Sequence, residues 1–235
     1  MTVVAISLAG CSSYSSMTNV FIFGLMYANT TRNDLDTTRK NTTKALSDLK
    51  GSSQLEVRTG YFGMCVNQHG VLWVCSNDAD ALAQQIGPGN DPLDLIGTAS
   101  QFKNNVLFSG VLLMALILAL FSAILLATFP GRPKERTGSD VDFRPFPFRI
   151  VAHYAMTGAF AAAVLLLIAG LWQHVGSVGA AAVADIANSG NVSTAIGGNA
   201  MILVWTSVFI ETIVAAGTMV TIISLISLES LTDND

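Results

Sequence analysis

Charged residues are scarce in this chain. Of its 235 residues, 12 are Lys or Arg and 16 are Asp or Glu, 28 in all. That share is about half of what ordinary soluble proteins carry. Residues 106–130 and 150–184 contain no charge, and 186–228 contain only Glu211. This distribution excludes a water-soluble globule.

The chain also has few basic residues and few cysteines. The net charge is −4, and no run of the sequence builds the positive stripe that neutralises nucleic-acid phosphates. We therefore expect no nucleic-acid partner. Three cysteines are too few for a small disulfide framework, but they leave room for one bridge.

Motifs for catalysis are missing as well. The sequence has no H-E-x-x-H, no G-x-S-x-G and no phosphate loop. Its three histidines, His69, His153 and His174, are scattered rather than set at metal-ligand spacing. We predict that the protein is not an enzyme and has no metal site and no cofactor.

Long apolar runs are what the chain has instead. Residues 106–130, 150–172 and 201–228 are each long enough, at about 1.5 Å per residue, to cross a hydrocarbon core of about 30 Å. We predict a membrane helix in each, so that the lipid bilayer is a partner. Trp172 and Trp205 should lie at the outer interface, where aromatic side chains are enriched.

The orientation of the predicted spans follows from the linker at 131–149. It carries five Lys or Arg residues, so the positive-inside rule places it in the cytoplasm. Three glycosylation sequons, at Asn29, Asn41 and Asn191, all fall on the opposite side. The remaining segments are then outer loops at 12–105 and 173–200 and a cytoplasmic tail at 229–235.

The first eleven residues are apolar but too short to cross a bilayer alone. We interpret residues 1–11 as the outer part of a first membrane helix that is truncated upstream. The alternative is a signal peptide or lipobox ending at Cys11, although the positive amino-terminal region of an export signal is absent. With the three complete spans, the preferred interpretation gives a four-helix transmembrane bundle.

The outer loop at 12–105 is rich in polar residues and predicts a small antiparallel β-sheet standing on the membrane. Asn67 to Gly70 has turn chemistry and should join two strands in a hairpin. A short helix is expected at 37–49. The apolar or alternating runs that predict strands are 20–27, 55–59, 61–66 and 71–76.

Cys65 and Cys75 lie across the expected hairpin, on the side that the sequons make extracellular. An oxidising compartment favours a disulfide between them, and two free buried thiols are the alternative. Closing a loop of about ten residues contributes roughly 2 to 3 kcal/mol in the chain-entropy model. Cys11 is left as a free thiol or as the partner of a cysteine in the missing upstream segment.

Five carboxylates stand out. Glu211 falls near the centre of the last span, where a carboxylate is expensive; it either serves a cation pathway or is protonated and hydrogen-bonded to a neighbouring helix. Asp78, Asp80, Asp91 and Asp94 follow the second hairpin cysteine closely. They could attract cations, although their spacing matches no EF-hand and a solvated acidic loop is the alternative.

Gly60-Tyr61-Phe62-Gly63-Met64-Cys65, followed by Trp73 and Cys75, resembles the claudin superfamily. It is still more similar to the fungal Ca²⁺ regulator and membrane-fusion family, which is induced by mating factor. The segments at 10–13 and 171–174 also resemble that family. The tryptophan that claudins place near the first cysteine is replaced here by Phe62 or Met64, a departure from their pattern.

The resemblance implies a claudin-like, multi-pass protein of the plasma membrane. It implies promotion or regulation of low-affinity calcium influx and of membrane fusion during mating or polarised growth. Calcium would then be the transported or regulating ion, and partners would be other calcium-channel subunits or further copies of the chain. The alternative is a structural or adhesive organiser that acts through the loop at 12–105, with calcium changes secondary.

Overall fold

The computed structural model describes residues 2–12, 17–28, 37–51, 53–68, 70, 72–128, 149–188 and 190–232. The chain divides into two compact units. We call Thr2–Ser109 with Ala169–Trp205 the sheet unit, and Gly110–Ile168 with Thr206–Asp235 the helical unit.

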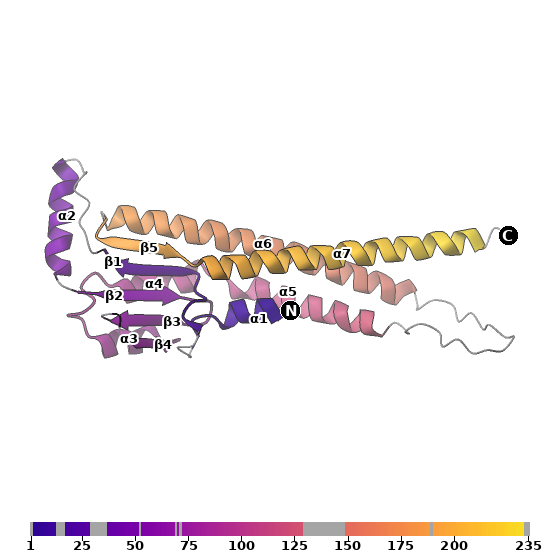
Figure 1. The fold of residues 1–235 in the computed structure, drawn as a ribbon, viewed down its shortest axis with the longest axis horizontal. Helices are drawn as coiled ribbons and strands as arrows, with labels where there is room; N and C mark the ends of the chain where they lie inside the picture. The colour runs from indigo at the N-terminus through magenta and orange to yellow at the C-terminus, as the bar shows by residue number, and fades with distance from the viewer. Residues whose placement is uncertain are drawn as a thin grey trace. The chain divides into compact units, whose positions relative to one another are not determined.

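The sheet unit contains one five-stranded antiparallel sheet with the order β4-β3-β2-β1-β5 (Figure 1). Side chains alternate between its faces, as in β2, where Leu55, Val57 and Thr59 are buried while Glu56 and Arg58 are half-buried. The strands are β1 Phe23–Tyr27, β2 Leu55–Thr59, β3 Met64–Gln68, β4 Leu72–Ser76 and β5 Val192–Ile196.

Two short helices cover the apolar face of the sheet. Helix α4, Leu95–Asn105, packs against β1 and β2, and α3, Ala79–Ile86, packs against β3 and β4. The rings of Phe23 and Phe102 are 4.6 Å apart at their centroids and form part of this core. The helix expected at 37–49 is present as α2, Thr37–Lys50.

The observed strands differ from the expected ones in two ways. Strand β2 has the predicted bounds, whereas β1 begins three residues later than expected and β3 begins at Met64. Strand β5 was not foreseen, because its five residues fall in the segment 173–200 that we expected to be a loop. It pairs with β1 along its full length, from Tyr27 opposite Val192 to Phe23 opposite Ile196.

In the part of the chain that the structure describes, three helices are long and apolar enough, by length and composition, to cross a membrane. They are α5 Ser109–Ala127, α6 Arg149–Ala187 and α7 Gly198–Thr232, and they contain most of the three predicted spans. Helix α6 has 39 residues, about 58 Å at 1.5 Å each, which exceeds a hydrocarbon core of about 30 Å. It therefore continues as helix into the first half of the expected outer loop.

Within the helical unit, small residues let α5 and α6 approach closely. Ala155, Ala159 and Ala162 of α6 are fully buried, and the hydroxyl of Ser122 on α5 donates a 2.6 Å hydrogen bond to the Ala155 carbonyl. Small residues and hydroxyl bonds are typical of helix contacts in lipid. Large apolar side chains of α5 such as Ile117 point outward, as expected of a surface that faces acyl chains.

Two regions of the prediction need separate mention. Residues 2–9 form the helix α1, Thr2–Ala9, which is about 12 Å long and belongs to the sheet unit. The linker at 131–149 lies outside the described residues except for its last, which begins α6. Three apolar helices and an antiparallel sheet are thus present, while the complete four-helix bundle stays a prediction.

Candidate functional site: the Gly60 to Cys75 hairpin and its partners

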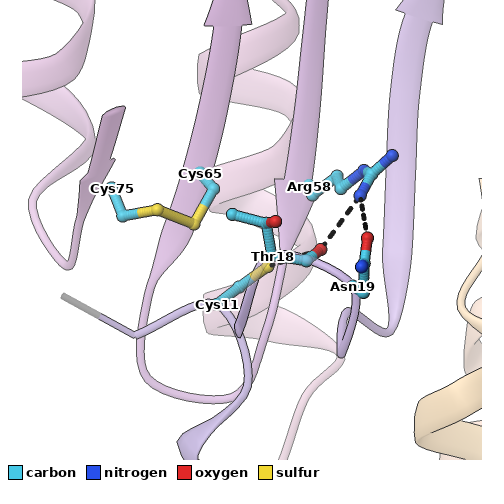
Figure 2. The surroundings of a disulfide bond; sticks show 6 residues. All are labelled: Cys11, Thr18, Asn19, Arg58, Cys65 and Cys75. Atoms are coloured by element: carbon cyan, nitrogen blue, oxygen red, sulfur yellow. Dashed lines mark hydrogen bonds between the residues drawn. A yellow bond between two sulfur atoms is a disulfide. The ribbon is translucent and has the colours of Figure 1, made fainter. Parts of the chain in front are cut away.

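Cys65 and Cys75 are joined by a disulfide, as predicted (Figure 2). They are opposite each other in the β3–β4 pairing, with their Cα atoms 4.0 Å apart. The bridge therefore ties strand β4, at one end of the strand order, to its neighbour β3. Cys65 has no exposed surface, whereas Cys75 is half-buried, so the bond runs from the packed interior to the edge of the sheet.

The two glycines of the motif allow another backbone segment to approach the turn between β2 and β3. A Cβ atom on Gly60 would collide with the Gly10 carbonyl, and one on Gly63 would lie 2.5 Å from the Cys11 carbonyl oxygen. The Gly60 N–H donates to the Gly63 carbonyl at 2.9 Å and closes the turn. The spacing of these glycines is thus explained by the close passage of residues 10–12.

Cys11 is a free thiol at the centre of this contact. It is fully buried, has a positive φ of 47°, and its Sγ donates to the Thr18 carbonyl at 3.7 Å (Figure 2). A positive φ is uncommon for a residue with a side chain. The packing around the turn holds Cys11 in this conformation, which supports a structural role for its side chain.

Tyr61 connects the motif to α6. Its hydroxyl donates a 2.7 Å hydrogen bond to Oε1 of Gln173, and both side chains are buried. Burial raises the pKa of the Tyr61 hydroxyl above its ordinary value. Next along α6, the indole N–H of Trp172 donates to the Val106 carbonyl at 2.8 Å. The motif and the segments at 10–12 and 171–174 therefore meet in one place.

Arg58 is a central residue of the site that the sequence analysis did not single out. Its guanidinium lies 4.4 Å from the ring centroid of Trp73 and 4.8 Å from that of Phe21. Its Nε also lies 2.7 Å from a carboxylate oxygen of Glu56. Trp73 of the motif thus makes one of two cation–π contacts with Arg58.

The same guanidinium holds the segment before β1 against the sheet. One terminal nitrogen of Arg58 donates to the Thr18 carbonyl at 3.1 Å and to the Asn19 side-chain oxygen at 3.3 Å (Figure 2). The Thr18 carbonyl also accepts from Cys11. The one signal for this role in the sequence was an arginine alternating with apolar residues in a strand, which usually indicates a solvent-facing position.

Three of the four predicted cation-attracting carboxylates bond to protein donors. Asp78 and Asp94 cap the first turns of α3 and α4 by accepting from backbone N–H groups. Asp91 accepts from the Tyr27 hydroxyl at 2.8 Å and from two N–H groups of α4, whereas Asp80 is exposed. No group of three metal-binding side chains occurs among the described residues. Cation attraction by these aspartates stays a prediction.

The other predicted sites are dispersed. Glu211 lies within α7 and is half-buried. Asn191 is 2 % exposed and its amide donates to the Asn188 carbonyl at 3.3 Å, so a glycan there would require this side chain to leave its position. Asn41 belongs to α2, and Asn29 lies outside the described residues.

Apolar helices of membrane-spanning length and a disulfide-closed antiparallel sheet together define a membrane protein. A family model described as the Ca²⁺ regulator and membrane fusion protein Fig1 matches residues 40–224, which is most of the chain. The chain belongs to this family, as its motif indicated. The matched range includes the hairpin, α5, α6 and most of α7. No curated protein and no solved structure matches the chain.

Proposed function

We propose that this protein is a claudin-like, multi-pass protein of the fungal plasma membrane that promotes or regulates low-affinity calcium influx and membrane fusion in mating or polarised growth. Membership of a family described as a Ca²⁺ regulator and membrane fusion protein supports the proposal. The observation that carries it is the assembly of the Gly60 to Cys75 motif, residues 10–12 and the 171–174 segment around one hairpin.

In this proposal the sheet unit recognises partners, and the helices transmit that recognition into the membrane. The partners are other calcium-channel subunits or further copies of the chain. Glu211 serves as the carboxylate of the helices that responds to cations, because an ionisable group within a span is usually functional. No catalytic step is involved.

Calcium imaging in a deletion strain tests the proposal. The strain would be complemented with the wild type, with the pair Cys65→Ala and Cys75→Ala, or with Glu211→Gln. Glu229→Gln is the matched control, since it alters a carboxylate at the predicted cytoplasmic end of the same helix. At an equal level of protein at the cell surface, we expect reduced calcium uptake for the cysteine double variant and for Glu211→Gln. We expect no reduction for Glu229→Gln. Unchanged uptake in both the cysteine double variant and Glu211→Gln would overturn the proposal.

The second candidate is a structural or adhesive organiser, with calcium changes secondary. It is favoured by the construction of the sheet, which joins strands from two distant segments into one body suited to recognition. The order of events separates the candidates. If calcium rises normally in the deletion strain while membrane merger fails, adhesion is primary; if added calcium restores fusion, influx is primary.

Whether the chain conducts ions by itself is a separate question for purified protein. Liposomes that enclose a calcium-sensitive dye would be reconstituted with the full chain. Calcium entry that depends on protein and falls in Glu211→Gln supports a pore. If no calcium enters the liposomes, the protein has an auxiliary role in calcium influx.

A further inference from the structure

Besides Trp205, three large aromatic side chains among the described residues of the sheet unit are exposed, although they come from separate segments. Phe62 is in the turn between β2 and β3, Phe108 directly precedes α5, and Trp172 is in α6. Their exposed fractions are 44 %, 65 % and 61 %. Scattered exposed apolar residues are normal on a protein surface, but a contiguous group marks an interaction site.

Two hydrogen bonds bring the segments that carry these three residues together within the sheet unit. Tyr61, the neighbour of Phe62, is hydrogen-bonded to Gln173, the neighbour of Trp172. Trp172 is itself hydrogen-bonded to Val106, two residues before Phe108. The first bond is buried and the second is exposed, and both are shorter than 3 Å, so these two bonds connect the segments that carry the three aromatic residues.

The chemistry of this group fits the boundary between lipid headgroups and acyl chains. Helix α5 starts at Ser109, directly after Phe108, and is the most apolar of the three long helices. Phe108 is therefore joined directly in the chain to a helix of membrane-spanning length. The one polar atom of the Trp172 ring is already bonded to a protein carbonyl, so the rest of that ring can enter an apolar layer.

We propose that Phe62, Phe108 and Trp172 form an interfacial aromatic cluster that seats the Gly60 to Gly63 turn on the outer surface of the bilayer in which the protein is anchored. The partner is the lipid surface itself. The turn then fixes the height of the disulfide-closed hairpin above the membrane. The inference rests on membership of a membrane-protein family and does not depend on calcium influx.

Site-directed spin labelling tests the contact. Phe62→Cys and Phe108→Cys would be labelled with a nitroxide and reconstituted in phosphatidylcholine vesicles. Leu72→Cys is the matched control, because Leu72 is an exposed apolar residue at the opposite end of the same hairpin, paired with Gln68. The wild type gives the background, which should be low since Cys11 is buried and the other cysteines are bonded.

We expect the ratio of oxygen to nickel-complex accessibility to be several-fold higher at positions 62 and 108 than at 72, because oxygen concentrates in lipid and the complex in water. A ratio at 62 equal to that at 72 would show that the turn faces water and overturn the proposal. Low accessibility to both reagents at 62 would show a protein contact there and also overturn it.

If Phe62→Cys does not fold, Phe62→Trp gives the same information. Brominated acyl chains should quench the added emission of Phe62→Trp and leave that of Leu72→Trp unchanged. Equal quenching of the two would contradict the proposal. Because neither measurement involves calcium, a negative result here is distinct from failure of the proposed function.

Discussion

The Tyr61 hydroxyl donates a buried 2.7 Å hydrogen bond to Oε1 of Gln173, although 112 residues separate the two in the sequence. One residue belongs to the disulfide hairpin motif and the other to α6. The bond thus connects the turn that precedes β3 to a helix that continues toward the membrane. A buried acceptor that loses its donor is costly, so this contact is a sensitive point of the sheet unit.

Tyr61→Phe should lower the free energy of unfolding by about 1 to 3 kcal/mol, because Gln173 Oε1 would stay buried without its donor. Thermal unfolding in detergent measures the change, and Tyr154→Phe, which alters an exposed residue, should have little effect. A double-mutant cycle with Gln173→Leu should give a coupling energy above about 0.5 kcal/mol. Additive effects would show that the bond contributes nothing.

Gly60→Ala should destabilise the protein by about 1 to 3 kcal/mol or more, because its methyl group would collide with the Gly10 carbonyl. Gly89→Ala is the matched control, since a Cβ there meets no atom within 4 Å. Alkylation of Cys11, followed by mass spectrometry, should become faster in Gly60→Ala as residues 10–12 are displaced. Equal stability and labelling in both variants would contradict this account of the motif.

Arg58→Lys should lower the free energy of unfolding almost as much as Arg58→Gln does, although lysine keeps the positive charge. An ammonium lacks the planar face that contacts Phe21 and Trp73, and it cannot donate from two fixed nitrogens as Arg58 does to Glu56 and Thr18. We expect a loss of about 1 to 2 kcal/mol in unfolding experiments. Full retention of stability in Arg58→Lys would show that charge alone matters.

Asp91→Asn and Asp80→Asn separate a structural role from cation attraction. Asp91 accepts three hydrogen bonds, whereas Asp80 is exposed in the first turn of α3. Asp91→Asn should therefore cost about 1 to 3 kcal/mol of stability, and Asp80→Asn only a few tenths. If both variants keep wild-type stability and both reduce calcium uptake, the cation-attracting role is correct.

High pH should destabilise the sheet unit through its buried tyrosines. Burial raises the pKa of Tyr27 and of Tyr61 above the unfolded value of 10, so the folded state keeps protons that the unfolded chain has lost. Their stabilising contribution is complete below about pH 10 and is lost as the pH rises further. Unfolding midpoints from about pH 8 upward should fall less steeply in Tyr27→Phe than in the wild type. Parallel curves would contradict this.

Much of the fold followed from local patterns. The apolar runs predicted α5, α6 and α7, and the alternation of residues 55–59 predicted β2 with its observed bounds. The disulfide followed from two cysteines across one expected hairpin. These features depend on neighbours in the sequence, which is why the sequence was sufficient for them.

The features that were missed depend on distant partners. Strand β5 contains Ser193 and Thr194 within five residues, a weak pattern that becomes a strand because β1 offers a free edge. We expected helix α6 to end at membrane length, although no proline follows Trp172 before Ala187. The role of Arg58 is evident only once the fold has brought Phe21 and Trp73 into contact with its guanidinium.

The position of β5 also determines when the sheet unit can be completed during biosynthesis. Val192 pairs with Tyr27, 165 positions earlier (192 minus 27), so the ribosome must first make both α5 and α6. Until then the nascent chain carries β1 with a bare edge, which is a template for aggregation. Any truncated product that stops before residue 192 keeps that edge permanently and becomes a natural substrate for cellular quality control.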